Sequence, residues 1–188
     1  MTSDLPAASA AVAASVLAHV MSAPATLGDG RLICIDGPAG AGKTTLSQAL
    51  EAFAPAVVVV HCDDLLQGWQ GLPCLADTIA ALVRPLSVGQ PGQWRRWDWL
   101  ADSWAETRTV EPGGLVVLEG VGSWSPTIAP WVGSLVWVEA PSDLRLARGL
   151  ARDGEDLRPQ WIQWRRDESD LLARLGTRAR ADLVITTG

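Results

Sequence analysis

The stretch Gly37-Pro38-Ala39-Gly40-Ala41-Gly42-Lys43-Thr44 decides the fold of this chain, because its spacing, Gly-x4-Gly-Lys-Thr, is typical of a phosphate-binding loop. The apolar run Arg31–Asp36 before it predicts a buried strand, and Thr45–Phe53 after it predicts a helix. Glycine lets backbone N–H groups turn inward around an anion, and the helix directs the positive end of its dipole at the same point. We therefore expect residues 37–45 to bind a nucleoside triphosphate. Lys43 can reach its β- and γ-phosphates, and the Thr44 hydroxyl can take a place on Mg²⁺.

The composition of the 188 residues predicts one domain and excludes several classes of protein. Hydrophobic residues make up 48% and charged residues 19%, which argues against disorder. The net charge of −6 argues against a nucleic-acid or anionic-membrane surface. No apolar run approaches the roughly 18 residues that cross a bilayer, and the N-terminal residues, with Asp4 and no basic lead-in, resemble no export signal. We expect a cytoplasmic protein without nucleic-acid or membrane partners.

Metal-binding and disulfide patterns are not recognisable in the sequence. Cys34, Cys62 and Cys74 have no metal-ligand spacing, and an odd number suits a reducing compartment. His19 and His61 do not suggest a zinc site either. Any metal is therefore expected at the phosphates.

Further strands and helices alternate along the chain. Four more apolar runs predict strands, at residues 57–60, 115–118, 134–138 and 181–186. Helices are expected over residues 5–22, about 75–83, about 142–153 and about 160–175. We see no internal repeat and no second domain, so the prediction is one α/β domain over residues 1–188.

Acidic residues follow two of these strands. Asp63 and Asp64 come just after the run at 57–60, and Glu119 directly follows the run at 115–118. In an open α/β sheet, ligands sit at the carboxyl ends of the strands. Four apolar residues followed by an acid is the Walker B pattern, so Glu119 is expected to serve Mg²⁺, directly or through water.

Two further segments have the marks of functional regions. Residues 65–100 are rich in glycine, proline and tryptophan and look irregular outside the helix at 75–83, which suits the binding of an acceptor substrate. Arg145, Arg148 and Arg152 have the spacing i, i+3 and i+7 and share one helix face. The alternative for these arginines is a solvated face that pairs with Asp153 and Glu155.

These features together resemble the small-molecule kinases that include uridine kinase, nicotinamide riboside kinase, pantothenate kinase and phosphoribulokinase. The resemblance rests on the loop, the Asp-Asp pair, the Glu-Gly after the third strand and the arginine-rich run at 145–153. Bacterial uridine kinase-like ATP-binding proteins are more similar still, since they share the segments here at Gly68–Leu72, Trp97–Trp99 and Glu119–Ser123.

The resemblance implies a three-layer α/β/α P-loop fold, with a five-stranded parallel sheet in the order 2-3-1-4-5. It implies a substrate-binding insert at residues 65–110 and an arginine-bearing lid at residues 145–160. Neighbouring strands lie about 4.8 Å apart, so Glu119 would lie beside the loop and Asp63 one strand farther away. That gap leaves room for an acceptor hydroxyl.

By the same resemblance, Asp63 is the catalytic base, and Lys43, Arg148 and Arg152 stabilise the transferred phosphoryl group. Capping of the next turn remains the alternative for Asp63. The candidate substrate-binding residues are Asp64, Trp69, Trp97 and Asp98. Asp64 could instead support Asp63, hold a metal-bound water or cap the turn. For Asp98, a role as a turn acid between core tryptophans stays open.

The predicted function is transfer of the γ-phosphate of ATP, with Mg²⁺, to a hydroxyl of a small, perhaps nucleoside-like, molecule. A nucleoside monophosphate kinase is one alternative, since Ile35–Gly40 also resembles the start of cytidylate kinases, and Arg84, Arg95 and Arg96 would then grip the acceptor's phosphate. A nucleotide-binding regulatory protein without a small substrate is another. The sequence leaves open whether two copies form a homodimer.

Overall fold

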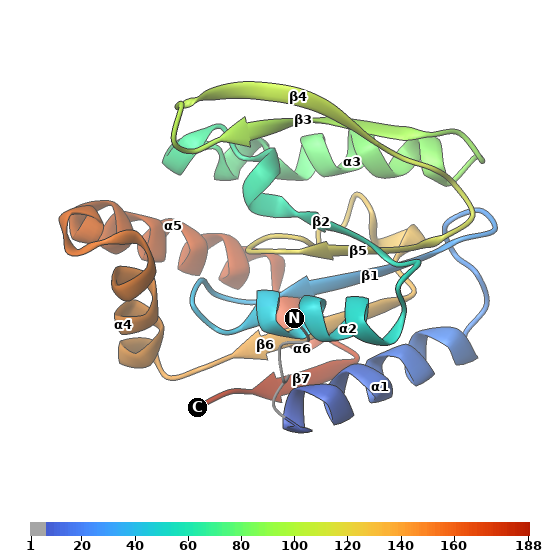
Figure 1. The fold of residues 1–188 in the computed structure, drawn as a ribbon, viewed down its shortest axis with the longest axis horizontal. Helices are drawn as coiled ribbons and strands as arrows, with labels where there is room; N and C mark the ends of the chain where they lie inside the picture. The colour runs from blue at the N-terminus through green and yellow to red at the C-terminus, as the bar shows by residue number, and fades with distance from the viewer. Residues whose placement is uncertain (1–6) are drawn as a thin grey trace.

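The computed structural model describes residues 7–188, and its centre is a parallel sheet of five strands. In spatial order these strands are β2 (Val58–His61), β5 (Leu115–Glu119), β1 (Arg31–Asp36), β6 (Ser134–Glu139) and β7 (Leu183–Thr186) (Figure 1). Counted along the chain without the two strands of a separate hairpin, this is the order 2-3-1-4-5. The predicted sheet is therefore confirmed.

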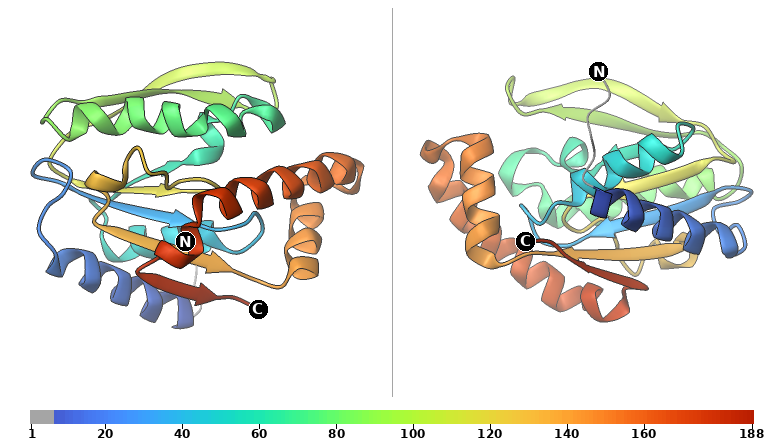
Figure 2. Two further views of the ribbon diagram at one scale, coloured as in Figure 1. Left: turned by 180° about the vertical axis from the view of Figure 1, so that it is seen from behind. Right: turned by 60° about the horizontal axis from the view of Figure 1, so that its bottom comes forward.

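Helices cover both faces of the sheet (Figures 1 and 2). Because side chains of a strand alternate between faces, Ile33 and Ile35 pack in one apolar cluster and Leu32 and Cys34 in the other. The first cluster lies under α1 (Ala7–Ser22) and α2 (Lys43–Phe53), and the second lies under α3 (Leu75–Leu86) and α5 (Arg158–Leu175). The first two residues of the helix predicted at 5–22 lie outside the described part of the chain.

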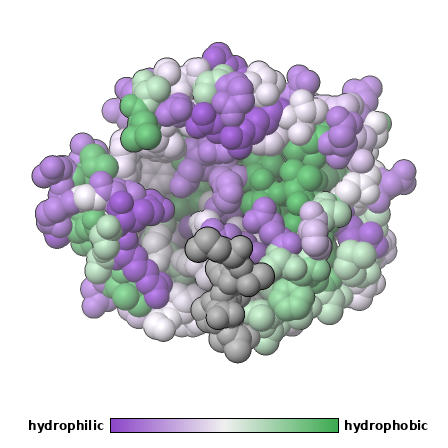
Figure 3. All heavy atoms as spheres, in the orientation of Figure 1, coloured by the Kyte–Doolittle hydropathy of each residue, from purple (hydrophilic) through white to green (hydrophobic). Residues whose placement is uncertain are grey.

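Residues 65–100 were expected to be irregular outside one helix, but their last part forms the first strand of a regular β-hairpin, so that expectation was wrong. β3 (Gly92–Asp98) and β4 (Ser103–Val110) form a two-stranded antiparallel sheet that packs on α3. A bulge between Arg95 and Trp97 puts two arginines between the buried Trp94 and Trp97, which breaks the two-residue alternation that marks a strand. Hydrophilic side chains predominate over the hairpin (Figure 3).

Short 3-10 turns connect β2 to α3, and several helix ends differ from the predicted ones. The turns are η1 (Cys62–Leu65), η2 (Gly68–Gln70) and η3 (Leu72–Cys74). α3 continues to Leu86 because Pro85 falls in its last turn, where the lost N–H removes a single helical bond.

The remaining elements lie toward the C-terminus. They are η4 (Ala129–Trp131), α4 (Ser142–Asp153), η5 (Glu155–Leu157) and α6 (Thr177–Arg180). Ser142 is the first residue of α4, and its hydroxyl accepts a hydrogen bond from Arg165. Between residues 7 and 188, no helix has the length and hydropathy that a membrane crossing requires.

Candidate active site

The phosphate-binding loop lies between β1 and α2, and Lys43 is the first residue of α2. Gly37 is required there for two reasons: its φ is 139°, and a Cβ atom would lie 2.0 Å from the carbonyl oxygen of Val138. Gly40 and Gly42 also have positive φ. The backbone can therefore turn its N–H groups toward one point at the N-terminus of α2, as an anion-binding site requires.

The two predicted magnesium ligands are in contact. The parallel register places Glu119, at the end of β5, beside β1 on one side and His61 on the other. Thr44 Oγ1 donates to Glu119 Oε1 at 3.2 Å, and His61 Nδ1 lies 2.6 Å from the same oxygen. This bond to Glu119 is the main cause that raises the pKa of His61.

The oxygen atoms of Thr44 and Glu119 are of the kind that Mg²⁺ prefers. Among the described residues there is no cluster of three or more His, Cys, Asp or Glu side chains suited to a metal ion. Thr44 and Glu119 fit Mg²⁺ only if phosphate oxygens and water complete its coordination, as is usual for nucleotide-bound magnesium.

A cavity of about 750 Å³ opens beside the phosphate-binding loop. This volume is in the usual range for small-molecule sites. Loop residues, η1 and the end of β5 form one part of its lining, while α4, α5 and the tip of the hairpin form much of the rest. The charged and hydroxyl side chains that line it are Lys43, Thr44, Asp63, Asp64, Glu119, Arg148, Arg152 and Asp153.

Asp63 lies in η1, directly after β2, and lines the cavity. The residue is exposed to solvent. Partial desolvation by the surrounding protein nevertheless raises the pKa of Asp63, and the negative charge of Glu119 raises it further, whereas Lys43 and Arg152 lower it. The indole Nε1 of Trp99 donates to the main-chain oxygen of Asp63 at 3.1 Å, which ties the hairpin tip to this residue.

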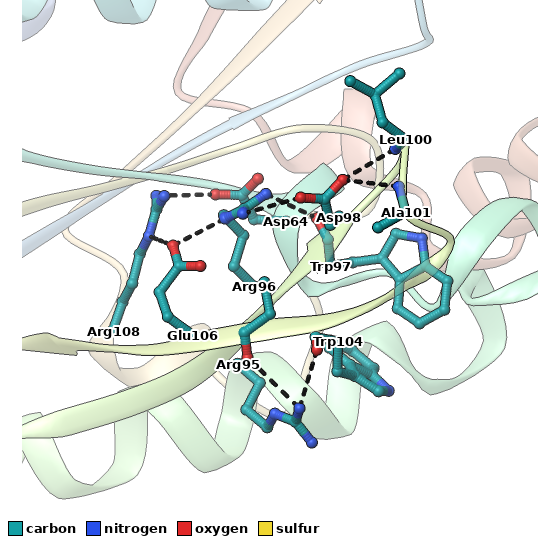
Figure 4. A network of polar contacts seen from close by, with 11 residues as sticks. Asp64, Arg95, Arg96, Trp97, Asp98, Leu100, Ala101, Trp104, Glu106 and Arg108 are labelled. Atoms are coloured by element: carbon teal, nitrogen blue, oxygen red, sulfur yellow. Dashed lines mark hydrogen bonds and ion pairs between the residues drawn. The ribbon is translucent and has the colours of Figure 1, made fainter.

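Asp64 also lines the cavity, but its carboxylate already has a partner. Arg108 Nη1 on β4 donates to Asp64 Oδ2 at 3.3 Å, and the same guanidinium pairs with Glu106 at 2.9 Å (Figure 4). Burial raises the pKa of Asp64, and the charge of Arg108 opposes that rise. The observed contact attaches Asp64 to the hairpin.

Solved structures with a similar architecture include one described as a possible uridine kinase and one described as a D-glycerate 3-kinase. A possible uridine kinase from Bacillus stearothermophilus superposes with a TM-score of 0.66 at 20% identity, over 93% of this chain and 98% of that one. D-Glycerate 3-kinase from Cryptococcus neoformans superposes with a TM-score of 0.56 at 11% identity, over 92% of this chain and 88% of that one. The chain has the fold of the P-loop small-molecule kinases.

The sequence comparisons show less about this chain than the comparison of structures does. No protein-family model matches the chain. Two curated proteins of Arabidopsis thaliana, inorganic pyrophosphatases TTM1 and TTM2, are 27% and 26% identical to it in alignments of 132 positions that cover 65% of this chain. The chain spans about one fifth of the length of these relatives, since the match covers 20% of each.

In this kinase fold, α4 carries the three arginines of the predicted lid. Arg148 and Arg152 line the cavity, but Arg145 does not. Arg148 donates to the main chain of the phosphate-binding loop. Arg152 pairs with Asp153 at 2.6 Å and lies 5.9 Å from the ring centre of Trp161. The ion pair with Asp153 is the alternative that the sequence left open for Arg152. Arg152 nevertheless also lines the cavity.

Two predicted substrate-binding residues lie outside the cavity lining. Asp98 accepts hydrogen bonds from two main-chain N–H groups of the turn that follows it, both at 3.0 Å, and pairs with Arg96 at 3.3 Å (Figure 4). Its position corresponds to the turn acid that was the alternative. Trp97 is buried and packs edge-on against Trp104, with ring centres 5.1 Å apart.

Tryptophans form much of the apolar lining, and most of them were not predicted. Trp69, which was predicted, packs edge-on against three others, with ring centres 5.7–6.2 Å apart. These three are Trp99, Trp161 and Trp164, and all four line the cavity. The excess of ten tryptophans over one phenylalanine was the available signal, but it does not tell core residues from lining residues.

Proposed function

We propose that this protein is a Mg²⁺-ATP-dependent phosphotransferase that transfers the γ-phosphate to a hydroxyl group of a small molecule. The observation that carries the proposal is that one cavity is lined by both the phosphate-binding loop and Asp63. The loop suits a triphosphate, with Thr44 and Glu119 as protein ligands of Mg²⁺. The carboxylate of Asp63 suits the role of general base for an acceptor bound next to that triphosphate. The kinase fold agrees with this reaction class but does not identify the acceptor.

Each side chain has a defined task in the proposed reaction. The acceptor oxygen attacks the γ-phosphorus while its proton passes to the carboxylate of Asp63, and ADP leaves with the electrons of the broken bond. The raised pKa of Asp63 makes it a stronger base than an ordinary aspartate. Lys43, Arg148 and Arg152 stabilise negative charge on the transferred group, and Mg²⁺ supplies further charge neutralisation when bound.

The cavity lining favours an acceptor that has no phosphate of its own. Arg84, Arg95 and Arg96 were the candidates to grip such a phosphate, and none of them lines the cavity. Arg95 donates to the main chain of β4, and Arg96 pairs with Asp98 and Glu106. These contacts count against a nucleoside monophosphate kinase. The indole-rich wall suits an acceptor with a flat or apolar portion.

Hydrolysis of pyrophosphate is a second candidate. The curated relatives are called inorganic pyrophosphatases. A loop and Mg²⁺ ligands that hold two linked phosphates would serve that reaction as well, with water in place of the acceptor hydroxyl. The apolar wall has no task in that reaction, so we place it second.

A screen of turnover separates these functions. Purified full-length protein is incubated with Mg²⁺-ATP and a library of small hydroxyl compounds and their phosphates, and separately with pyrophosphate, with Lys43→Ala as the blank. We expect ADP to form only with an unphosphorylated acceptor present. Phosphate release from pyrophosphate without ATP consumption would favour the second candidate, and tight ATP binding without turnover would favour a regulatory protein.

A further inference from the structure

Glu168 is a buried carboxylate that the proposed reaction leaves without a task. It lies on α5 and is 2% exposed. Its Oε2 accepts from the main-chain N–H of Ala39 at 2.8 Å and from Trp164 Nε1 at 3.1 Å. Its Oε1 accepts from Arg145 Nη1 at 3.1 Å. A carboxylate is costly to bury unless it is paired and hydrogen-bonded, so its position against the phosphate-binding loop calls for a reason.

Arg145, the partner of Glu168, holds the same loop residue from α4. Its Nη1 donates to the carbonyl oxygen of Ala39 at 3.3 Å. The backbones of α4 and the loop are also in close contact, since a Cβ atom on Gly40 would lie 2.5 Å from the carbonyl oxygen of Arg145. Both main-chain polar groups of Ala39 are thus bonded to side chains from the two helices that wall the cavity.

The neighbouring carbonyl groups of the loop follow the same pattern. Four successive carbonyls, from Pro38 to Ala41, each accept a hydrogen bond from a side chain. These bonds fix the planes of the peptide groups and therefore the directions of the N–H groups between them. A loop that binds an anion needs those N–H groups aimed in advance. The donors, in order, are Lys43, Arg145, Arg148 and Thr187.

We propose that Glu168 and Arg145 are positioning residues for nucleotide binding, which hold the Ala39 backbone and couple α4 and α5 to the phosphate-binding loop. This inference rests on the proposed function, because it takes the loop as the nucleotide site. The guanidinium of Arg145 neutralises the carboxylate of Glu168, so the carboxylate can orient the loop with little repulsion of a bound phosphate. Nucleotide affinity then depends on two side chains that do not touch the nucleotide.

The test is equilibrium binding of MgADP and of inorganic pyrophosphate to the full chain, measured by calorimetry at a temperature where circular dichroism shows each variant folded. For Glu168→Ala we expect both ligands to bind about tenfold more weakly or worse, a loss of about 1.4 kcal/mol. Glu168→Gln keeps an oxygen that can accept from Ala39, so it should recover part of the loss. Arg145→Ala should weaken binding similarly, and the double variant by less than the sum.

Controls separate positioning from a merely structural contribution. Asp167→Asn changes an exposed acid on the same helix and should leave both dissociation constants unchanged. If Glu168→Ala lowers the melting temperature but the folded protein binds as the wild type does, the inference is overturned. Tighter binding would also overturn it, because Glu168 would then compete with phosphate for the Ala39 N–H. If Glu168→Ala does not fold, the same measurements are made on Glu168→Gln and Arg145→Lys. Wild-type dissociation constants in both of these folded variants would overturn the inference.

The failure of this inference differs from the failure of the proposed function. Wild-type protein that binds neither ligand overturns both. Loss of binding in Lys43→Ala, together with wild-type binding in the variants at Glu168 and Arg145, overturns only the positioning role.

Discussion

The hydroxyl oxygen of Thr44 lies 3.2 Å from Oε1 of Glu119, although 75 positions separate the two residues in the chain. The contact joins the first turn of α2 to the end of β5. Thr44 is the last residue of the glycine motif, and Glu119 is the acid of the Walker B pattern. Their contact brings the two predicted Mg²⁺ ligands close enough to bind the same ion.

Replacement of Glu119 by Gln tests this site. The amide keeps the shape of the side chain but removes the negative charge, so the Mg²⁺ concentration for half-maximal turnover should rise by about tenfold or more. The measurement is ADP formation against Mg²⁺ concentration. Glu51→Gln, on the exposed side of α2, is the matched control and should leave the curve unchanged. An unchanged curve for Glu119→Gln would remove this residue from the magnesium site.

Replacement of Asp63 by Asn tests the base. The variant cannot accept the acceptor's proton, so kcat should fall by about 10²–10⁴-fold while the dissociation constant of MgATP stays within about twofold. Steady-state kinetics and calorimetry measure the two quantities. Asp64 is the matched control, because its carboxylate is already paired with Arg108. The variant Asp64→Asn should therefore lose much less activity. Equal losses in both variants would argue against Asp63 as the base.

Trp99→Phe tests the hydrogen bond between the hairpin and Asp63. The substitution keeps an aromatic wall residue but removes the N–H that donates to the main-chain oxygen of Asp63. The loss of one hydrogen bond, worth about 0.5–1.5 kcal/mol, should lower kcat by about 2- to 10-fold. Trp104→Phe changes a hairpin tryptophan outside the cavity lining and should have no such effect. A drop of the same size in Trp104→Phe would point to general weakening of the hairpin.

Asp36 makes folding stability depend on pH. It is fully buried and accepts hydrogen bonds from the N–H groups of Gly37, Gly122 and Trp124. Burial raises its pKa from 3.8 to about 6, although these bonds and Lys43 lower it in part. Between these two values the unfolded chain has lost the proton and the folded protein keeps it. The free energy of unfolding should therefore fall as pH rises from about 4 to about 6, by about 1.4 kcal/mol per unit from this group.

Urea unfolding of the wild type and Asp36→Asn over pH 4–7 isolates this contribution. The asparagine does not titrate, and all other groups are common to both proteins, so their effects cancel in the difference. The stability of the wild type relative to the variant should decline up to about pH 6 and then level off. A difference that is flat, or that grows with pH, would mean that the folded protein holds Asp36 ionised.

The central sheet and the acids at its edge could be predicted because their signals are local. The glycine spacing and the apolar runs each occupy a few consecutive residues, and parallel strands end at one edge, so Asp63 and Glu119 were expected near the loop. The hairpin was not predicted because the bulge between Arg95 and Trp97 interrupts its alternation. In consequence Trp97 was assigned to the substrate, whereas the structure puts Trp99 on the cavity wall.

The sequence by itself determined the phosphate-binding loop, the order of elements around it and the acids that follow the strands. These features depend on glycine geometry and on runs of apolar residues, which neighbours along the chain specify. Only the tertiary structure decided which tryptophans line the cavity. The hydrogen bonds of Glu168 and Arg145 to the main chain of Ala39 also follow from the tertiary structure alone. Those contacts span 129 and 106 positions, and the packing of α4 and α5 on the sheet sets them.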